Sequence, residues 1–194
     1  MTKPASLTRS VLLRSCAPAA LSLALALAPK AVQAQAFQAT PEVFQGDVSI
    51  DREMPNIDRI RVDGFDAVID WAPQEINGAS LTFLPDGNTA IFLGAPDASG
   101  FAVLNRIQPT AISTPAEFAG TVQAFLTDSS GTPTTPGGFV AFYSPTGILV
   151  SGTAVVEVPQ LMLTTNDVDI ASFTDFATGA GPLLVSGTSS TVSI

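Results

Sequence analysis

The chain lacks residue types on which much enzyme chemistry depends. Among its 194 residues there is no histidine, and the single cysteine is Cys16. The absence of histidine excludes Ser-His catalysis and the commonest zinc sites. One cysteine provides neither a cysteine cluster nor a disulfide framework. We therefore expect no catalytic residue, no bound cofactor and no metal, and a fold that is stabilised by packing and backbone hydrogen bonds.

Residues 1–34 have the features of a secretory signal peptide. Its basic start is provided by Lys3, Arg9 and Arg14. A short apolar core follows at 17–29, and small residues then predict cleavage between Ala34 and Gln35, with cleavage after Ala36 as the alternative. No segment reaches the ~20 apolar residues of a membrane-spanning helix. We predict passage through the periplasm, no stable membrane insertion, and a secreted or cell-surface protein.

Positive charge is scarce once residues 1–34 are set aside. Both lysines and two of the six arginines lie in that segment, which leaves four arginines against 17 acidic residues, a net charge of −13. Such a surface repels phosphate backbones and anionic lipid headgroups. We therefore expect no nucleic-acid partner and no attachment to an anionic membrane surface.

Short apolar runs between turn residues predict an all-β chain. The candidate strands are 60–62, 67–69, 80–84, 89–93, 101–105, 120–126, 139–143, 148–150, 153–158, 161–165, 168–170 and 183–185. Residues 37–58 are interpreted as a short strand or cap with loops, and 127–138 as an exposed polar loop. No helix is predicted beyond the signal peptide, apart from one turn near 115–118. This spacing fits stacked short coils, although a β-sandwich has similar spacing.

Two apolar, β-rich runs flank a tight turn. The turn residues are Ser144, Pro145, Thr146 and Gly147. Pro145 fixes its own φ near −65°, and Gly147 can adopt a positive φ. The flanking runs, 139–143 and 148–150, do not alternate cleanly between apolar and polar residues. Such runs are typical of strands covered on both faces, so this stretch is interpreted as scaffold or recognition surface.

Two sets of acidic residues could in principle form a catalytic carboxylate pair or a calcium site, but the spacing of each set disfavours it. Asp66 and Asp70 resemble a glycosidase carboxylate pair, but residues four apart on a strand are separated by roughly 13 Å. A solvated strand face is the preferred interpretation. Asn166, Asp167 and Asp169 offer oxygen ligands for calcium, but they match no calcium-binding motif. We therefore predict that the protein is not an enzyme.

Five segments carry motifs in a recognisable order. They are Ile69-Asp70-Trp71 followed by Ile76-Asn77-Gly78, then Val103-Leu104-Asn105-Arg106-Ile107, 118–122, 137–150 and 155–165. Together they resemble the N-terminal secretion domain of filamentous-haemagglutinin-like exoproteins, the secreted half of two-partner secretion systems. The chain departs from the family in several places: Ser144 and Thr146 replace the asparagines of the family's Asn-Pro-Asn-Gly turn, the loop 127–138 is longer, and residues are inserted near Ile91-Phe92-Leu93.

The resemblance implies a right-handed parallel β-helix with N-terminal capping strands over residues 35–194, cut short before the family's long repetitive shaft. It also implies export by an outer-membrane partner transporter and an adhesin role toward a host or cell-surface receptor. The residues that it assigns to transporter recognition or to structure are Asp70, Trp71, Asn105, Arg106, Ser144, Pro145, Thr146 and Gly147. The alternatives are a β-helical enzyme acting on polysaccharide and a structural surface-layer β protein.

Arg106 has two possible roles. It is the only basic residue beyond Arg61, and it lies between the apolar residues Leu104 and Ile107. An unpaired guanidinium is very costly to bury, so it must point outward or find partners. It is either a hydrogen-bonding hub that joins neighbouring coils or a contact with the transporter.

Overall fold

The computed structural model describes residues 35–74, 81–108, 114–187 and 192–193. All of these belong to one compact unit, Val32–Ile194. The predicted signal peptide and the Ile76-Asn77-Gly78 segment lie outside the described residues. Within the described ranges, no helix is long and apolar enough to cross a bilayer.

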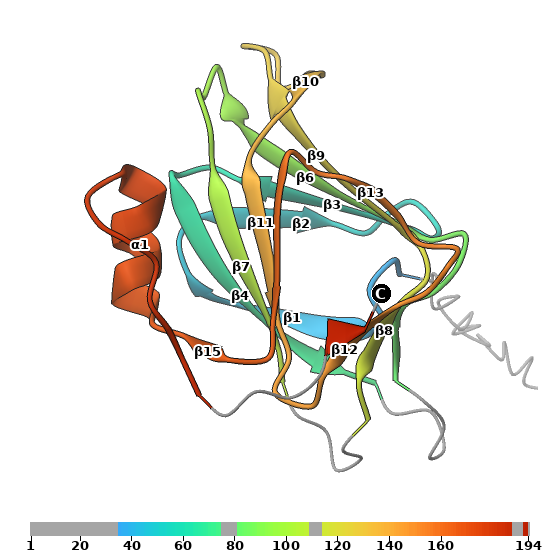
Figure 1. The fold of residues 1–194 in the computed structure, drawn as a ribbon. Coiled ribbons are helices and arrows are strands. Elements are labelled where there is room, and N and C mark those ends of the chain that lie inside the picture. The colour runs from blue at the N-terminus through green and yellow to red at the C-terminus, as the bar shows by residue number, and fades with distance from the viewer. Residues whose placement is uncertain (1–34, 75–80, 109–113, 188–191, 194) are drawn as a thin grey trace, which may run out of the picture. The chain divides into compact units, whose positions relative to one another are not determined.

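Three sheets form the body of this unit (Figure 1). Sheet A contains, in spatial order, β1 (Ala39–Gln45), β4 (Asp66–Pro73), β7 (Ala102–Ile107), β11 (Phe139–Tyr143) and β14 (Gln160–Thr164). Sheet B contains β10 (Pro133–Pro136), β9 (Thr121–Thr127), β6 (Thr89–Pro96), β3 (Ile57–Val62) and β2 (Val48–Asp51), and β13 (Val155–Glu157) also pairs with β9. Sheet C contains β17 (Val192–Ser193), β12 (Ile148–Val150), β8 (Ala116–Phe118) and β5 (Thr82–Leu84). A separate pair consists of β15 (Asp167–Val168) and β16 (Val185–Ser186).

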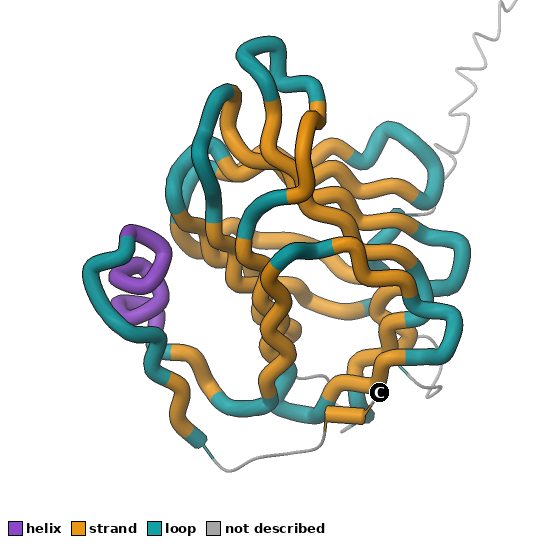
Figure 2. The backbone as a smooth tube through the Cα atoms, turned by 45° about the horizontal axis from the view of Figure 1, so that its top comes forward, coloured by secondary structure: helices purple, strands orange, loops and turns teal. Residues whose placement is uncertain are grey.

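The chain passes from sheet B to sheet A to sheet C and then begins the next coil in parallel register. In sheet B, Ile60 of β3 pairs with Phe92 of β6, and Phe92 pairs with Ala124 of β9. The backbone tube in Figure 2 shows these strands stacked coil upon coil. Stacked parallel strands define a β-helix and exclude the antiparallel sheets of a sandwich. The predicted all-β, parallel β-helix fold is confirmed.

Two antiparallel strands cap the first coil. β1 pairs with β4 at the edge of sheet A, and β2 pairs with β3 at the edge of sheet B. Without this cover, the first coil would expose a row of unpaired backbone groups that invites edge-to-edge association. The predicted N-terminal capping strands are therefore present.

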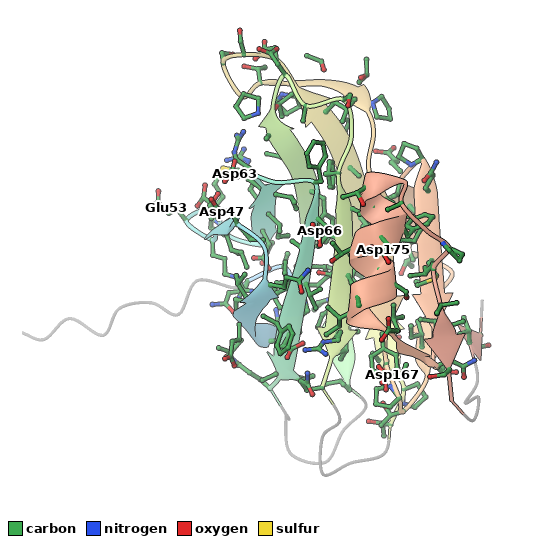
Figure 3. The ribbon with its side chains drawn as sticks, turned by 90° about the vertical axis from the view of Figure 1, so that its left-hand side faces the viewer. Asp47, Glu53, Asp63, Asp66, Asp167 and Asp175 are labelled. Atoms are coloured by element: carbon green, nitrogen blue, oxygen red, sulfur yellow. The ribbon has the colours of Figure 1, made fainter. Side chains whose placement is uncertain are left out.

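The middle strands of sheet A, β4, β7 and β11, are buried on both faces where helix α1 covers them. Val140 and Phe142 of β11 point into the main core, whereas Ala141 packs in a second cluster with Phe173. Phe173 belongs to helix α1 (Ile170–Thr178), which lies along the outside of sheet A in Figures 1 and 3. Successive strand residues point to opposite faces, so both sets must be apolar. This explains the missing alternation and confirms the prediction of coverage on both faces for the run 139–143. The prediction is wrong for the run 148–150, because Leu149 of β12 is 40% exposed.

Helix α1 corrects the prediction that no helix follows the signal peptide. Its N-cap is Asp169, whose side chain accepts a hydrogen bond from Ser172 N, and its C-cap is Gly179, in the left-handed region with φ 75°. An acidic N-cap and a glycine C-cap are the usual helix boundary signals. The segment is only nine residues long, so the apolar pattern was too short to reveal the helix.

Two further segment predictions are wrong. The turn expected near 115–118 is strand β8, and the loop expected at 127–138 contains strand β10. Pairing with neighbouring coils determines β8, because its three residues lie between β5 and β12. β10 pairs only with β9, and all of its side chains are exposed, so a polar composition does not prevent it from extending the sheet.

The predicted turn at 144–147 is present and forms a corner of the third coil. Gly147 has φ 113°, and its N–H donates to Ser144 O over 3.2 Å. The two flanking strands belong to different sheets, since β11 lies in sheet A and β12 in sheet C. The turn therefore redirects the chain between sheets instead of closing a hairpin.

Candidate functional site

A row of polar residues crosses the outer face of sheet A. Register aligns Glu42 of β1, Asp70 of β4, Arg106 of β7, Tyr143 of β11 and Thr164 of β14. We call these five residues the outer ladder. On β4, β7 and β11, each residue of the outer ladder comes two positions after an outward-facing apolar residue that packs in the cluster with α1. The β-helix thus brings together residues from four coils and the cap.

Asp70 and Arg106 form a bidentate ion pair at the centre of the outer ladder. Arg106 Nε donates to Asp70 Oδ1 over 2.6 Å, and Nη2 donates to Oδ2 over 2.8 Å. The two side chains are only 17% and 19% exposed for Arg106 and Asp70. Parallel hydrogen bonds between a guanidinium and a carboxylate are stronger and more directional than a single charged contact. The geometry is that of a hub joining two coils.

An exposed aromatic ring covers this ion pair. The Arg106 guanidinium carbon lies 4.4 Å from the centroid of the Phe44 ring, a cation–π arrangement. Phe44 is 56% exposed although it is large and apolar. It lies at an irregularity between β1 and β4, where the register shifts between Val43 and Gln45. Such bulges redirect side chains, and here one presents a phenyl ring beside a fixed charge.

Burial and the charges of Asp167 and Arg106 affect the pKa of Tyr143. Partial burial raises the pKa of the Tyr143 phenol above its usual value of 10.0, and the negative charge of Asp167 raises it further. Arg106 opposes both effects because a cation stabilises the phenolate. Tyr143 therefore remains a neutral phenol at physiological pH.

The other two strand residues assigned from the sequence, Trp71 and Asn105, lie inside the β-helix. Trp71 Nε1 donates to Asn105 Oδ1 over 3.0 Å, and Asn105 Nδ2 donates to Ala141 O over 3.1 Å. Trp71 and Asn105 are fully buried. They follow or precede Asp70 and Arg106 by one position, so the alternation of strand residues places them on the opposite face. Their contacts join three successive coils and are structural.

The four turn residues also have structural contacts. Ser144 is fully buried, and its N–H donates to Thr164 O over 3.1 Å. Its hydroxyl lies 3.2 Å from the Thr146 hydroxyl. The turn follows Tyr143 directly in the chain. Of the eight assigned residues, the structure therefore brings Asp70 and Arg106 together on a partly exposed surface. It places Trp71 and Asn105 in the core and the four turn residues at the corner between β11 and β12.

The carboxylates at 66 and 70 do not form a solvated face. Asp66 Oδ2 accepts hydrogen bonds from Gln45 Nε2 at 2.9 Å and from Thr174 Oγ1 at 2.7 Å. Figure 3 shows Asp66 beside helix α1, to which Thr174 belongs. Asp66 thus fastens the helix to the sheet, while Asp70 is paired with Arg106. Asp169, considered above as a calcium ligand, caps the helix.

Sequence reasoning missed Phe44 and Tyr143 as members of this surface. Neither residue stands out locally, because both are aromatic residues within expected strands. The register that aligns Tyr143 with Arg106 depends on loops between coils, and the bulge that exposes Phe44 depends on pairing with β4. An exposed, large apolar side chain beside a fixed charge is a feature of recognition surfaces.

These features define the chain as a capped parallel β-helix with a side helix. Among solved structures, the fold is similar to the HMW1 secretion domain from Haemophilus influenzae, with a TM-score of 0.51 and 17% sequence identity. The match covers 71% of this chain and 30% of that chain. At this identity the similarity concerns the fold. No protein-family model and no curated protein matches the sequence.

Proposed function

We propose that the chain is a secreted exoprotein whose N-terminal domain is recognised by an outer-membrane partner transporter for export. One observation carries the proposal. The two motif segments around Asp70-Trp71 and Asn105-Arg106, assigned separately from sequence, lie on adjacent coils and contact each other twice. One contact is on the outer face and the other is in the core. A fold similar to a solved secretion domain supports the same function.

The proposed contact surface for the transporter is the outer ladder together with Phe44. Arginine and aromatic side chains supply much of the binding energy at protein interfaces, particularly where neighbouring groups hold them in place. Arg106 is held by Asp70, so little side-chain freedom is lost on binding. Phe44 offers an apolar anchor that is largely exposed in the free chain. A partner with an apolar pocket for Phe44 and carbonyl oxygens beside it, for the remaining N–H groups of Arg106, fits this surface.

The composition of the chain suits export in an unfolded state. After residue 34 there is no cysteine, so no disulfide can lock a premature fold in the periplasm. Each coil that stacks after crossing the outer membrane buries apolar surface worth roughly 25 cal/mol per Å². Folding outside the cell would therefore oppose backward movement of the chain.

Adhesion to a host or cell-surface receptor is the proposed downstream role. The contacts of Asp66 and Asp70 do not favour the polysaccharide-acting enzyme, because both carboxylates are held by protein partners. A structural surface-layer protein would share the fold but would need no dedicated transporter. The presence of a barrel transporter gene with periplasmic modules beside this one would distinguish the exoprotein from the surface-layer alternative.

The export experiment compares secretion with and without that transporter. We expect the chain in the medium only when the transporter is co-expressed, and equal secretion without it would contradict the proposal. Phe44→Ala should reduce transporter-dependent secretion while leaving thermal unfolding nearly unchanged. Phe65→Ala is the matched control, because Phe65 is also a largely exposed phenylalanine, at 67%, but lies outside the outer ladder. Equal effects of the two variants would remove Phe44 from the contact surface.

A further inference from the structure

The N-terminal end of the β-helix is closed by a short segment that precedes the first described strand. β1 begins at Ala39, and residues Gln35–Gln38 adopt bends without strand pairing. Phe37 is nevertheless fully buried, with its ring centroid 4.8 Å from that of Trp71 and 4.6 Å from that of Phe83. We call Gln35–Gln38 the plug, because it completes the aromatic core of the first coil.

A buried carboxylate holds the backbone of the plug. Ala36 N and Phe37 N donate to the two oxygens of Asp58, each over 3.0 Å. Asp58 is fully buried and also accepts from Arg52 Nη2 over 3.0 Å. A charge in this position is tolerated only when its lone pairs are occupied, and here two of the donors come from the plug.

Two further side chains complete the binding site. Arg52 Nη1 donates to the side-chain oxygen of Gln35, and the guanidinium carbon lies 5.2 Å from the Trp71 ring centroid. Asn88 Nδ2 donates to the carbonyls of Gln35 at 3.0 Å and Ala36 at 3.1 Å, and Asn88 is only 6% exposed. Burial lowers the pKa of Arg52, and the charge of Asp58 opposes that shift. We call Asp58, Arg52 and Asn88 the cradle.

We propose that the cradle is a docking site for the chain's own N-terminal segment, the plug. The plug opens and closes separately from the β-helix. The processed, folded exoprotein begins at Gln35. The cradle side chains hold residues 35–37 of the plug, and two isolated backbone hydrogen bonds hold Gln38, from Gln38 N to Phe83 O at 2.9 Å and from Gln74 N to Gln38 O at 3.0 Å. Each strand, in contrast, is held by a continuous backbone ladder. Segments with few backbone contacts open locally at lower free energy than core strands. Docking covers the open end of the solenoid, which would otherwise expose apolar surface.

The cradle also distinguishes the two predicted cleavage positions. A chain beginning at Gln35 retains every contact described above. A chain beginning at Phe37 loses both carbonyls that Asn88 binds and one of the backbone donors to Asp58. The Phe37 nitrogen of the shorter chain would be an α-ammonium that still pairs with Asp58. Asn88 and Arg52 would lose the oxygens of Gln35 and Ala36 that they bind, so fewer hydrogen bonds would hold the plug.

The first experiment identifies the N-terminal peptide of the processed chain by mass spectrometry, after expression of the full precursor and recovery from the periplasm. The expected peptide begins at Gln35. A peptide beginning at Phe37 would overturn the assignment of the first residue, and this result is independent of any transporter.

The second experiment uses Trp71, the single tryptophan of the sequence, as a reporter. In the processed chain, Asp58→Asn should expose Trp71 to acrylamide at denaturant concentrations where the β-sheet circular dichroism signal is unchanged. Asp63→Asn is the control, because it makes the same charge change at an exposed position between β3 and β4. Asn88→Ala should give the same early exposure if Asp58→Asn does not fold. Coincident loss of both signals in the original chain and in Asn88→Ala would show that the plug does not open separately.

Discussion

Asp70 and Arg106 are 36 residues apart in the chain, yet they share two parallel hydrogen bonds across β4 and β7. This pair joins the first coil to the second on the outer face. One position away, Trp71 and Asn105 make the corresponding contact in the core. The two contacts lie on opposite faces of the same two strands, so the first two coils are joined on both sides.

Arg106→Lys should destabilise the fold by about 1–3 kcal/mol, because lysine keeps the charge but loses one of two charge-assisted hydrogen bonds in a mostly buried pair. Denaturant unfolding would measure the change. Arg59→Lys is the control: Arg59 lies 3.9 Å from Asp51 with both side chains largely exposed, so a change of no more than about 1 kcal/mol is expected. If Arg106→Lys does not change the free energy of unfolding, Arg106 is not a hub that joins the coils. If it does not change transporter binding either, Arg106 is not a transporter contact.

Asn105→Leu should cost on the order of 2–4 kcal/mol. Leucine is similar in size but leaves both the Trp71 indole N–H and the Ala141 carbonyl without their partner in the core. The free energy of unfolding and the position of the single indole N–H resonance would both report the loss. Gln123→Leu removes an exposed hydrogen bond to Glu157 and should have little effect. A native indole resonance in Asn105→Leu would contradict the observed hydrogen bond.

Gly147→Val should destabilise the third coil by on the order of 1–3 kcal/mol, because a β-branched residue is strained at a φ of 113°. Thermal unfolding of the purified chain would measure it. Gly152→Val is a matched control, since nothing lies within 4 Å of a side chain added there and its φ is outside the left-handed region. If both variants melt alike, the turn does not require a positive φ at 147.

Ionisation of Tyr143 should lower stability at high pH. Burial and Asp167 raise the pKa of Tyr143 above 10.0 in the folded chain, so Tyr143 ionises at a lower pH in the unfolded chain. The free energy of unfolding therefore falls as the pH rises past 10. The stabilising contribution is complete below that pH and declines toward the folded-state pKa. Because Tyr143 is the single tyrosine, ultraviolet absorbance titrates it directly. Asp167→Asn should lower this pKa and Arg106→Gln should raise it, and the opposite order would contradict the proposed charges.

The sequence by itself determined the class of fold and most strand positions. Apolar runs without alternation indicated strands covered on both faces, and Pro145 with Gly147 located the corner of a coil, because these signals depend on local backbone preferences. The composition predicts that the chain is not an enzyme and binds no nucleic acid, and these stay predictions. It could not reveal helix α1, whose stability comes from packing Phe173 against the outside of sheet A.

Only the tertiary structure decided which residues meet. The partner of Arg106 is set by the loop lengths between coils, which place Asp70 opposite it, and no local pattern encodes that register. The same holds for Asp58, an ordinary acidic residue in sequence, which becomes a buried anchor because the chain folds the plug back over the first coil. Contacts between residues far apart in the chain form only when the whole β-helix is assembled.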